Sequence, residues 1–541
     1  MKNKPYPLYS LPLISDLKDM VRQRTDESFD EIAFSFMADT GRTARRTFGE
    51  FSDDINCLGT YFFDKGYHGK HIAIIGKNSY EWLVAFMAIV NGGNVAVPID
   101  KNLPPEKVCQ LLRQSDCSVA VVSKKGAALI EPLSKDDSEN NIDVFHTANF
   151  ADYIAYGKKL IENGDREFID YEIEPEKMAA IFFTSGTTGD SKGVMLSHKN
   201  MASDINAACK NFVLNGNTLS VLPFHHTFGL ITAVLKVYHY GFSTHLNSSL
   251  KNLQAELREV KPQTLFVVPL FVKTFYKSII STARKKGKEK LIIRASKISG
   301  TLLNIGVDVR NMLFQSVMSA FGGNLEYIIC GGAALDPQYV KALRSFGINI
   351  LNGYGITECS PVVSVNRNHY WRDGSVGQIL DGCFIKIADD NEILVKGDNV
   401  MLGYYKDEIA TNAVLNNGWY STGDLGHVDK DGFLYITGRK KNLIILSNGE
   451  NVSPEEIEEQ ILRNEAVCEA VVYEDRGQLA IQIFPNEEYA GNQEYFENLI
   501  KDYNKVQPQY MHIQRVLLKD EEFEKNSTKK ILRFKITNKS C

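Results

Sequence analysis

The chain has 541 residues, which is too long for one ordinary hydrophobic core, so we expect more than one domain. Hydrophobic residues make up 44% and charged residues 23% of the sequence, a composition typical of globular proteins. The formal net charge of -5 is small for this length. It lacks the basic excess that favours nucleic-acid binding, so we expect no nucleic-acid partner.

The cysteine pattern and the apolar segments predict a cytoplasmic protein. The nine cysteines form no CxxC pair and no set with nearby histidines, which indicates reduced thiols rather than a disulfide framework or a zinc site. Residues 1–7 lead into no long apolar segment, so we expect no secretory signal. The best apolar run, residues 82–90, is far shorter than the roughly 20 residues of a spanning helix. We expect no membrane span, which leaves peripheral contact with a membrane open.

Short apolar runs alternate with helical patterns along the first part of the chain. Strands are predicted at 70–75, 94–98 and 118–122, and helices at 80–91 and 105–112. This alternation predicts βαβ units and a largely parallel sheet. The pattern resumes at 178–183 and 218–240, and buried strands are predicted at 264–268 and 325–329, separated by a helical stretch at about 270–320 that is rich in Lys and Arg.

From about residue 375 the predicted elements change to short strands and turns, including a turn at 429–432. A second small α/β unit begins near 440, where we place a domain boundary. Its first helix has Ser453 as the predicted N-cap and Pro454 at the first helical position, with Glu456 completing a capping box. Ile457 and Ile461 are predicted to share one face of that helix.

The segment Thr184–Gly193 combines three glycines, five hydroxyl side chains and a lysine directly after an apolar strand. Glycines let backbone amides approach a phosphate, hydroxyls donate hydrogen bonds and lysine adds a positive charge. The segment departs from the common P-loop, Gly-x4-Gly-Lys-Ser/Thr, because Ser191 precedes Lys192 and Gly193 follows it. Alone, the pattern leaves a phosphate-binding loop and a flexible turn equally open.

The segment Asn352–Glu358 has a composition suited to a nucleotide. Tyr354 lies between two glycines, where its ring can offer a face to a flat heterocycle. Thr357 and Glu358 place a hydroxyl beside a carboxylate, which suits phosphate and Mg²⁺. The alternative for this segment alone is a glycine-rich turn with a surface acid.

Four further segments have both a chemical and a structural interpretation. Asp424 can accept hydrogen bonds from a ribose diol, or it can be a turn residue. Arg439, within 438–442, suits ribose or phosphate oxygens, and the alternative is a solvated basic turn. The paired histidines in 222–229 suit either a site or structural packing, and the basic segment 526–533 is by itself typical of a solvated face.

Taken together and in this order, these segments resemble the adenylate-forming superfamily of acyl-CoA synthetases, peptide-synthetase adenylation domains and beetle luciferases. The resemblance extends from about residue 30 to 535. It implies an α/β fold with a large N-terminal domain of βαβ-type parallel sheets and a small β-barrel-like subdomain, over residues 1–438. A hinge at 439–441 and a small mobile α/β C-terminal domain at 442–541, which holds the catalytic lysine, are also implied.

The resemblance also implies site residues. The 184–193 segment corresponds to the loop that closes over the ATP phosphates, Glu358 to the Mg²⁺ ligand, and His226 to a histidine beside the carboxylate pocket. The catalytic residues implied are Lys530, Thr184, His226 and Glu358. The implied ATP- and AMP-binding residues are Thr184, Ser185, Gly186, Thr187, Thr188, Gly189, Lys192, Gly331, Gly332, Ala333, Asn352, Gly353, Tyr354, Gly355, Thr357, Asp424, Arg439 and Lys530.

In the C-terminal part, the resemblance assigns Lys530 as the catalytic lysine, Lys441 as the hinge residue and Gly449 to the face used for thioester formation. One departure concerns the residue before the catalytic lysine. The family usually has Thr-Gly-Lys, whereas this chain has Thr528-Lys529-Lys530. Ile531 and Arg533 follow as in the family pattern, which keeps the register on Lys530.

The implied activity is ATP- and Mg²⁺-dependent activation of a carboxylic acid to acyl-AMP with release of pyrophosphate, followed by transfer to CoA. Residues 230–237 contain no acid that could hold a substrate ammonium, so a free amino acid is disfavoured. The 270–320 stretch and the segment 438–445 resemble long-chain fatty acyl-CoA synthetases, which favours a medium- to long-chain fatty acid. The expected protein is a monomer or a homodimer.

Three alternatives remain. An acyl-AMP ligase would load an acyl carrier protein instead of CoA, and a non-catalytic relative would bind nucleotide only. A luciferase-like oxygenase is the third, because the same fold can host it.

Overall fold

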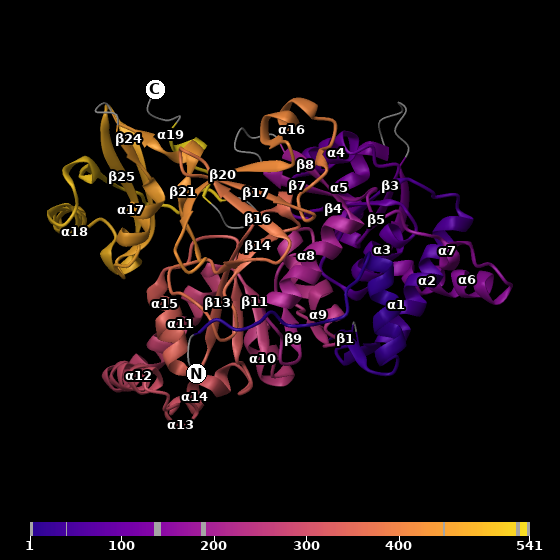
Figure 1. The fold of residues 1–541 in the computed structure, drawn as a ribbon, viewed down its shortest axis with the longest axis horizontal. Helices are drawn as coiled ribbons and strands as arrows, with labels where there is room; N and C mark the ends of the chain where they lie inside the picture. Colours follow the sequence, from indigo (N-terminus) through magenta and orange to yellow (C-terminus); the bar gives the residue numbers. More distant parts are fainter. Residues whose placement is uncertain are drawn as a thin grey trace. The chain divides into compact units, whose positions relative to one another are not determined.

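The computed structural model describes residues 4–38, 40–134, 142–185, 191–446, 450–525 and 531–537. The chain divides into two compact units (Figure 1). The first consists of Met1–Gly186, Ser191–Phe384 and Val395–Tyr420, and the second of Thr187–Asp190, Ile385–Leu394 and Ser421–Cys541.

A large sheet of the first unit brings together strands that are far apart in the sequence. Across the sheet, the strands are β15 (Gln378–Ile379), β14 (Val362–Val365), β13 (Asn349–Gly355), β12 (Tyr327–Cys330), β11 (Thr264–Val267), β9 (Thr218–Ser220), β10 (Thr244–Leu246), β1 (Ile32–Met37) and β2 (Thr43–Thr47). The neighbours from β13 to β1 pair in parallel, and antiparallel strands close both edges.

A second sheet of the first unit contains the strands predicted near the N-terminus. Its order is β18 (Gly403–Tyr404), β8 (Ser191–Ser197), β7 (Met178–Ser185), β4 (Val95–Ile99), β3 (His71–Ile75), β5 (Val119–Val122) and β6 (Asp143–His146). The pairs from β7 to β6 are parallel, whereas β7 and β8 form an antiparallel hairpin. Helices connect the parallel strands, as βαβ units require.

The helices of the first unit follow the strands in chain order. They are α1 (Leu17–Ser28), α2 (Phe48–Asp64), α3 (Tyr80–Asn91), α4 (Pro105–Gln114), α5 (Lys124–Ser134), α6 (Phe150–Glu162), α7 (Glu167–Asp170), α8 (His198–Asn211), the π-helix η2 (Phe228–Leu235), α9 (Lys236–His239), α10 (Leu253–Val260), α11 (Pro269–Lys285), α12 (Glu289–Asn304), α13 (Arg310–Leu313), α14 (Gln315–Ala320), α15 (Pro337–Phe346) and α16 (Glu408–Val414). Short 3₁₀ turns lie at η1 (Thr147–Asn149) and η3 (Thr357–Cys359).

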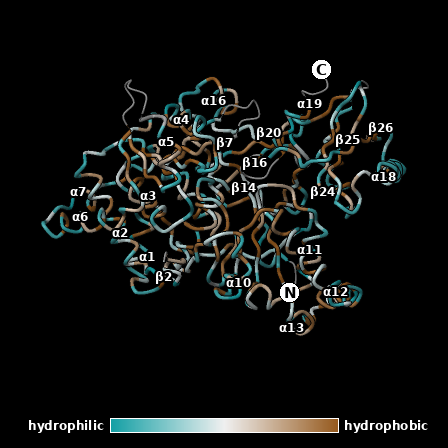
Figure 2. The backbone as a smooth tube through the Cα atoms, turned by 180° about the vertical axis from the view of Figure 1, so that it is seen from behind, coloured by the Kyte–Doolittle hydropathy of each residue, from teal (hydrophilic) through white to brown (hydrophobic). Residues whose placement is uncertain are grey.

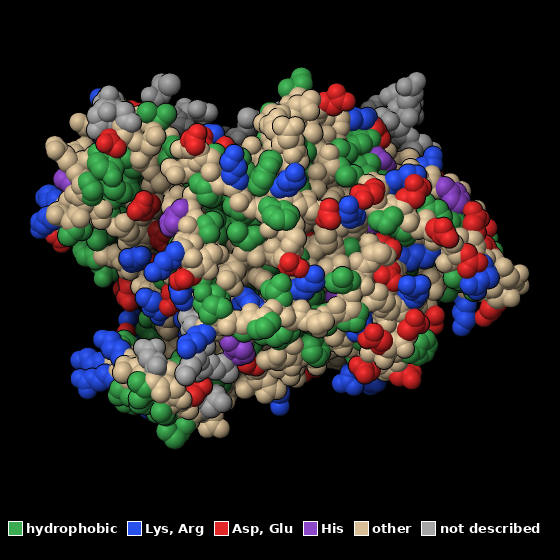
Figure 3. All heavy atoms as spheres, viewed as in Figure 1, with side chains coloured by type: hydrophobic (Ala, Val, Ile, Leu, Met, Phe, Trp, Pro, Cys, Tyr) green, Lys and Arg blue, Asp and Glu red, His purple; other side chains and the backbone are tan. Residues whose placement is uncertain are grey.

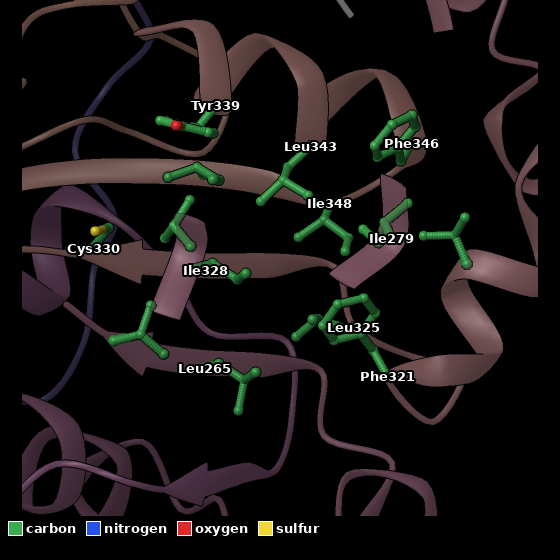
Figure 4. Packing of buried hydrophobic residues seen from close by; sticks show 14 of the residues in the cluster. Leu265, Ile279, Phe321, Leu325, Ile328, Cys330, Tyr339, Leu343, Phe346 and Ile348 are labelled. Carbon is green, nitrogen blue, oxygen red and sulfur yellow. The ribbon is translucent and has the colours of Figure 1, made fainter. Parts of the chain in front are cut away.

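The core beneath the large sheet is continuous and apolar. Figure 4 shows Leu265 and Ile328 from the strands facing Leu343 and Phe346 from α15, with Ile279 of α11 beside them. The strands in the middle of this unit are largely hydrophobic along their length, as the brown segments in Figure 2 show. Burial on this scale stabilises the sheet and fixes the positions at which its strands end.

The second unit contains two-layered α/β structure of its own. Its strands β24 (Val467–Asp475), β25 (Gln478–Pro485) and β26 (Ile513–Leu518) form one sheet, and β22 (Ile444–Ile445) pairs with β23 (Asn451–Val452). Its helices are α17 (Pro454–Ile461), α18 (Gln493–Lys505) and α19 (Phe534–Thr537), with 3₁₀ turns η4 (Lys440–Asn442), η5 (Glu487–Tyr489) and η6 (Gln509–Met511). Residues from α17, α18 and these strands share one buried cluster.

A smaller sheet has the order β16 (Cys383–Ile387), β17 (Glu392–Gly397), β20 (Trp419–Val428) and β19 (Leu415–Asn416), and β21 (Leu434–Arg439) pairs with β20. It corresponds to the predicted barrel-like subdomain and forms a half-barrel. The predicted α/β fold, with a large N-terminal domain and a small C-terminal one, is confirmed. The sheets are mixed, however, because the hairpins add antiparallel strands to the predicted parallel ones.

The predicted elements are found with small shifts of their ends. The predicted strand at 325–329 begins only at Tyr327, and the predicted 270–320 helical stretch is divided among α11, α12, α13 and α14. Between β9 and β10 the chain forms the π-helix η2, whose wider turn the apolar pattern does not reveal. None of the helices in the described ranges is long and apolar enough to cross a membrane.

The predicted capping box at α17 is wrong. Ser453 is the N-cap and Pro454 is the first helical residue, as expected, but the Ser453 side chain caps no helical amide. Its Oγ instead donates to the backbone oxygen of Thr437 at 2.9 Å. Because the hydroxyl forms its hydrogen bond with this tertiary acceptor, the local capping hydrogen bond does not form. Ile457 and Ile461 are both buried, as predicted.

Candidate active site

Candidate site segments follow the carboxyl ends of neighbouring parallel strands in the large sheet. The strands β9, β11, β12 and β13 are consecutive neighbours. His225 and His226 follow β9, the segment Gly331–Ala333 follows β12, and Asn352–Gly355 is the end of β13. Because the carboxyl ends of parallel strands lie at one edge of a sheet, these segments converge there. Ligands of open α/β sheets bind at this edge.

Close backbone approach between these segments depends on glycine. A Cβ built on Gly331 would lie 3.5 Å from the backbone oxygen of Gly353 and 3.6 Å from Cζ of Phe228, so these three positions adjoin. A Cβ on Gly355 would lie 2.2 Å from the backbone oxygen of Pro361, which is an impossible contact. Gly355 therefore lets β13 and β14 pair closely beside Tyr354.

Replacing Gly355 by alanine is expected to destabilise the first unit by about 1–3 kcal/mol, because the new methyl group must displace backbone. Chemical denaturation of the purified chain measures this change. Gly331→Ala is the matched control, since its methyl group would make only ordinary contacts and should change the unfolding free energy far less. Equal losses in the two variants would contradict the explanation.

The side chain of Asn352 presents an acceptor that the described part of the chain leaves without a donor. The residue is buried, and its Nδ2 donates to the backbone oxygen of Ser375 at 3.3 Å. Asn366 donates to the Asn352 backbone oxygen at 3.1 Å and holds the end of β13 in place. The Asn352 side-chain oxygen is buried and has no donor among the residues that the structure describes. Other buried polar atoms of the described residues also lack a partner, so its place two residues before Tyr354 is what makes this oxygen a candidate acceptor for a ligand donor.

The glycine-rich segment lies between two antiparallel strands rather than between a strand and a helix. Thr184 of β7 pairs with Lys192 of β8, and Ser185 pairs with Ser191. The predicted contacts Gly186, Thr187, Thr188 and Gly189 lie outside the described residues. A P-loop leads from a strand into a helix N-terminus, so the hairpin accounts physically for the departure of this sequence from that motif.

Tyr404 connects this hairpin with Glu358. Its hydroxyl donates to Oε1 of Glu358 at 3.0 Å, and the Lys192 ammonium lies 4.7 Å from the centroid of its ring. Burial, with the nearby Glu358 carboxylate, raises the pKa of Tyr404, so the phenol remains a donor. Thr357 precedes Glu358 in η3. Tyr404 could not be predicted from the sequence, because it follows Glu358 by 46 positions and belongs to no recognised motif.

The paired histidines are held next to the second sheet. The Asn78 side chain binds the backbone just before them: it donates to the Leu222 backbone oxygen at 2.7 Å and accepts from the Phe224 amide at 3.1 Å. His225 Nε2 lies 3.6 Å from Oδ2 of Asp100, at the end of β4. Burial lowers the pKa of His225 although Asp100 opposes this shift, so His225 is neutral near pH 7. The prediction named His226, whose ring lies 4.2 Å from that of His225.

Asp424 and Arg439 adjoin within the second unit. They are register partners on β20 and β21, and Arg439 Nε lies 2.8 Å from Oδ1 of Asp424. Asp424 is only 2% exposed, and its backbone amide is held by Thr422 Oγ1 at 3.0 Å. A guanidinium beside a fixed carboxylate offers both a donor and an acceptor to a diol or a phosphate.

The predicted hinge lies in the 3₁₀ turn η4, where Lys441 is exposed. Lys440 beside it pairs with Asp390 at 2.6 Å and with Glu392 at 2.8 Å, and these bonds raise its pKa. Two other predicted residues, Gly449 and Lys530, lie outside the described residues.

The described residues hold no group of three or more His, Cys, Asp or Glu side chains that could bind a metal. Glu358 is nevertheless suited to Mg²⁺, which prefers oxygen ligands and is commonly bound by one or two carboxylates together with phosphate oxygens and water. A single carboxylate such as Glu358 therefore fits a metal that arrives with a nucleotide.

Comparison with known proteins identifies the family. A model described as AMP-binding enzyme matches residues 21–405, and one described as AMP-binding enzyme C-terminal domain matches 441–539. The chain belongs to the AMP-binding enzyme family, which confirms the resemblance found in the sequence.

Curated relatives are just over a quarter identical to this chain within the aligned residues. The long-chain-fatty-acid–CoA ligase FadD15 of Mycobacterium bovis is 29% identical over 75% of this chain and 71% of its own length. Long-chain-fatty-acid–CoA ligase 1 of Cavia porcellus is 28% identical over 79% and 67%, respectively.

Solved structures share the fold at lower identity. An anthranilate CoA ligase bound to anthranoyl-AMP has a TM-score of 0.78 and 20% identity, and the match covers 98% of each chain. The o-succinylbenzoate CoA synthetase of Bacillus subtilis with ATP and a magnesium ion has a TM-score of 0.72 and 22% identity, over 96% of this chain and 99% of that one.

Proposed function

We propose that this enzyme activates a medium- to long-chain fatty acid with MgATP to give acyl-AMP and pyrophosphate, and then transfers the acyl group to CoA with release of AMP. The buried side-chain oxygen of Asn352, which has no donor among the described residues, supports this proposal most directly. It lies two residues before Tyr354, so the edge of one strand offers an acceptor for an exocyclic amine and a ring for stacking. Adenine supplies both partners.

The residues around the hairpin support a phosphate site, because Lys192 and Glu358 both contact Tyr404. Thr184 offers a hydroxyl, Lys192 a positive charge and Glu358 a carboxylate for Mg²⁺, which would neutralise charge on the phosphate oxygens. We assign Asp424 and Arg439 to the ribose, since a carboxylate accepts from hydroxyls and a guanidinium donates. Lys530 is the proposed catalytic cation at the α-phosphate, where negative charge accumulates during attack.

The proposed domain boundaries are 1–438, 439–441 and 442–541, with Lys441 as the hinge residue. The separate family matches, which end at 405 and resume at 441, support a boundary near the η4 turn. Rotation at this hinge would withdraw Lys530 and present the Gly449 face, so that a thiol could attack the acyl-AMP. Moving one domain lets one pocket serve two half-reactions.

An apolar substrate is supported by the segment after the histidines. The π-helix η2 is made of apolar residues and Thr232, and its residues from Gly229 to Leu235 are buried. It has no carboxylate for a substrate ammonium, and it adjoins Gly331 through Phe228. The curated relatives named as long-chain-fatty-acid–CoA ligases point to the same class of acid.

The decisive experiment is a pyrophosphate-release screen over carboxylic acids of graded chain length, with and without CoA. We expect release that depends on ATP, Mg²⁺ and a medium or long acyl chain, and CoA-dependent formation of a thioester. If the acyl group is transferred only to an acyl carrier protein, that protein and not CoA is the acceptor. No pyrophosphate with any acid would overturn the proposal in favour of a non-catalytic relative.

Replacing Tyr404 by phenylalanine is expected to lower kcat/KM about tenfold and to raise the Mg²⁺ concentration needed for half-maximal activity, because Glu358 loses its orienting donor. Titration of Mg²⁺ at fixed ATP measures the effect. Tyr405→Phe is the matched control, since that hydroxyl donates to Asp116 at 2.6 Å instead. An unchanged Mg²⁺ requirement in Tyr404→Phe would argue against Glu358 as the metal ligand.

A further inference from the structure

The helices α11 to α13 combine a local excess of positive charge with exposed apolar side chains. Residues 270–310 contain ten Lys and Arg and only two acids, in a chain whose overall charge is -5. Both acids are already paired: Glu289 lies 2.8 Å from Arg284, and Asp308 lies 2.7 Å from Arg310. Lys285, Lys286, Lys288 and the three cations of α12 are exposed and form no ion pair with a described acid.

Exposed large apolar side chains are concentrated in the same segment. Of the 22 such side chains on the described surface, eight lie between residues 270 and 313. Met312 is 76% exposed, Ile305 73%, Leu291 63% and Ile298 57%. Single exposed apolar residues are ordinary, but a group of this kind marks an interaction surface.

The inward face of α12 is fully used by the fold. Ile292 and Ala295 pack against the core beneath the large sheet, and Ser299 is completely buried, where its Oγ donates to the Ser345 backbone oxygen at 3.0 Å. These positions follow the helical repeat and define one side of the helix. The exposed apolar residues therefore belong to a second face, which packing within the unit does not explain.

That second face, which we call the α12 outer face, consists of Lys290, Leu291, Arg294, Lys297, Ile298 and Ile305. Leu291, Ile298 and Ile305 recur every seven residues and so form a stripe that runs along α12 to its C-cap, Ile305. Arg294 lies next to this stripe, and Lys290 and Lys297 lie beyond Arg294 on the same side, at the helical spacing. Figure 3 shows Lys and Arg side chains gathered with hydrophobic ones where Figure 1 labels α12 and α13.

We propose that the α12 outer face docks onto the surface of an anionic phospholipid membrane. A helix that presents long aliphatic side chains beside Lys and Arg lies in the interfacial plane, with its apolar stripe among the acyl chains and its cations at the phosphates. The exposed Val307 and Met312 extend the apolar surface beyond the end of α12. A nucleic acid would match the positive charge but not the aliphatic stripe. This surface does not depend on the proposed acid activation.

The test is flotation of the full chain with vesicles of phosphatidylcholine alone or with about one quarter phosphatidylserine. We expect binding to the anionic vesicles only, and weaker binding as salt rises. The variant Arg294→Glu/Lys297→Glu should weaken that binding at least about tenfold, because two attractive charges become repulsive. Leu291→Ser/Ile298→Ser should also weaken it, and an unchanged midpoint of thermal unfolding checks that both variants fold.

The matched control is Lys158→Glu/Lys159→Glu, which makes the same charge change at exposed positions of α6. It should bind anionic vesicles within about twofold of the unaltered chain if the α12 outer face is the site. Absence of binding to anionic vesicles, an equal loss in the control, or undiminished binding of the α12 variants would overturn the proposal. Binding of RNA by the chain without binding of vesicles would overturn it as well.

Discussion

Lys530→Ala is expected to reduce acyl-AMP formation by about a thousandfold while thioester formation from supplied acyl-AMP stays within a few-fold of the unaltered enzyme. The first half-reaction crowds negative charge around the α-phosphate, and the side chain proposed to offset it is this lysine. The second half-reaction has no such charge at phosphorus. Pyrophosphate release measures the first step, and synthetic acyl-AMP with CoA measures the second.

The neighbouring lysine provides the matched control for that experiment. Lys529 occupies the position at which related enzymes have glycine, so Lys529→Gly removes an adjacent charge and restores the family pattern. We expect this variant to retain adenylation. Equal loss of both half-reactions in Lys530→Ala, or a larger loss in Lys529→Gly, would remove Lys530 from the catalytic role.

The sequence was sufficient to predict the parts of the fold that local patterns encode. Apolar runs of strand length, separated by helical periods, predicted β3, α3, β4, α4 and β5 within a residue or two. The segment Asn352–Glu358 was recognisable because glycines, an aromatic ring and an acid occur within seven positions. Parallel strand order then brings that segment beside Gly331, which explains why motifs distant in the chain adjoin.

The contacts that the sequence could not predict are those that depend on tertiary packing. The Tyr404 hydroxyl donates to Glu358, and Asp100 lies near His225, between segments that are far apart in the sequence. The hydroxyl of Ser453 donates to the backbone oxygen of Thr437 and does not cap the amides of its own helix. In each case a distant group of the right polarity outweighs the local preference, and its position follows only from the assembled sheets.

The segment that contains Lys530 is anchored at both of its described ends within the second unit. Lys525 pairs with Glu469 on β24 and with Glu522, and it forms a β-bridge to Ile531. Three residues after Lys530, Arg533 pairs with Glu458 of α17. These pairs fix the ends between which Lys530 lies, so we infer that Arg533 is a positioning residue for it.

The Glu458–Arg533 pair is costly to break because it is desolvated. Glu458 is buried, and its Oε1 also accepts from the Val472 amide at 2.6 Å, which joins α17 to β24. Burial raises the pKa of Glu458 to about 7, and the attraction of Arg533 opposes that shift. A folded-state pKa above the ordinary 4.5 means that the folded state keeps its proton to higher pH. The free energy of unfolding therefore falls as pH rises between these two values.

Arg533→Met is accordingly expected to destabilise α17 and β24 by about 3 kcal/mol at about pH 8, and by less at about pH 5. Without the guanidinium the pKa of Glu458 rises further. The free energy of unfolding of the variant therefore keeps falling with pH above the value at which that of the unaltered protein becomes constant. Amide hydrogen exchange in α17 and β24 measures the change. The same variant should lose acyl-AMP formation more than thioester formation from acyl-AMP, since the described segment that follows Lys530 in the chain loses its anchor on α17. Glu458→Gln/Arg533→Met is the control, because a neutral amide removes the buried charge and with it the pH dependence. A pH-independent loss in Arg533→Met, or no recovery in the double variant, would show that the ion pair is not what holds this segment.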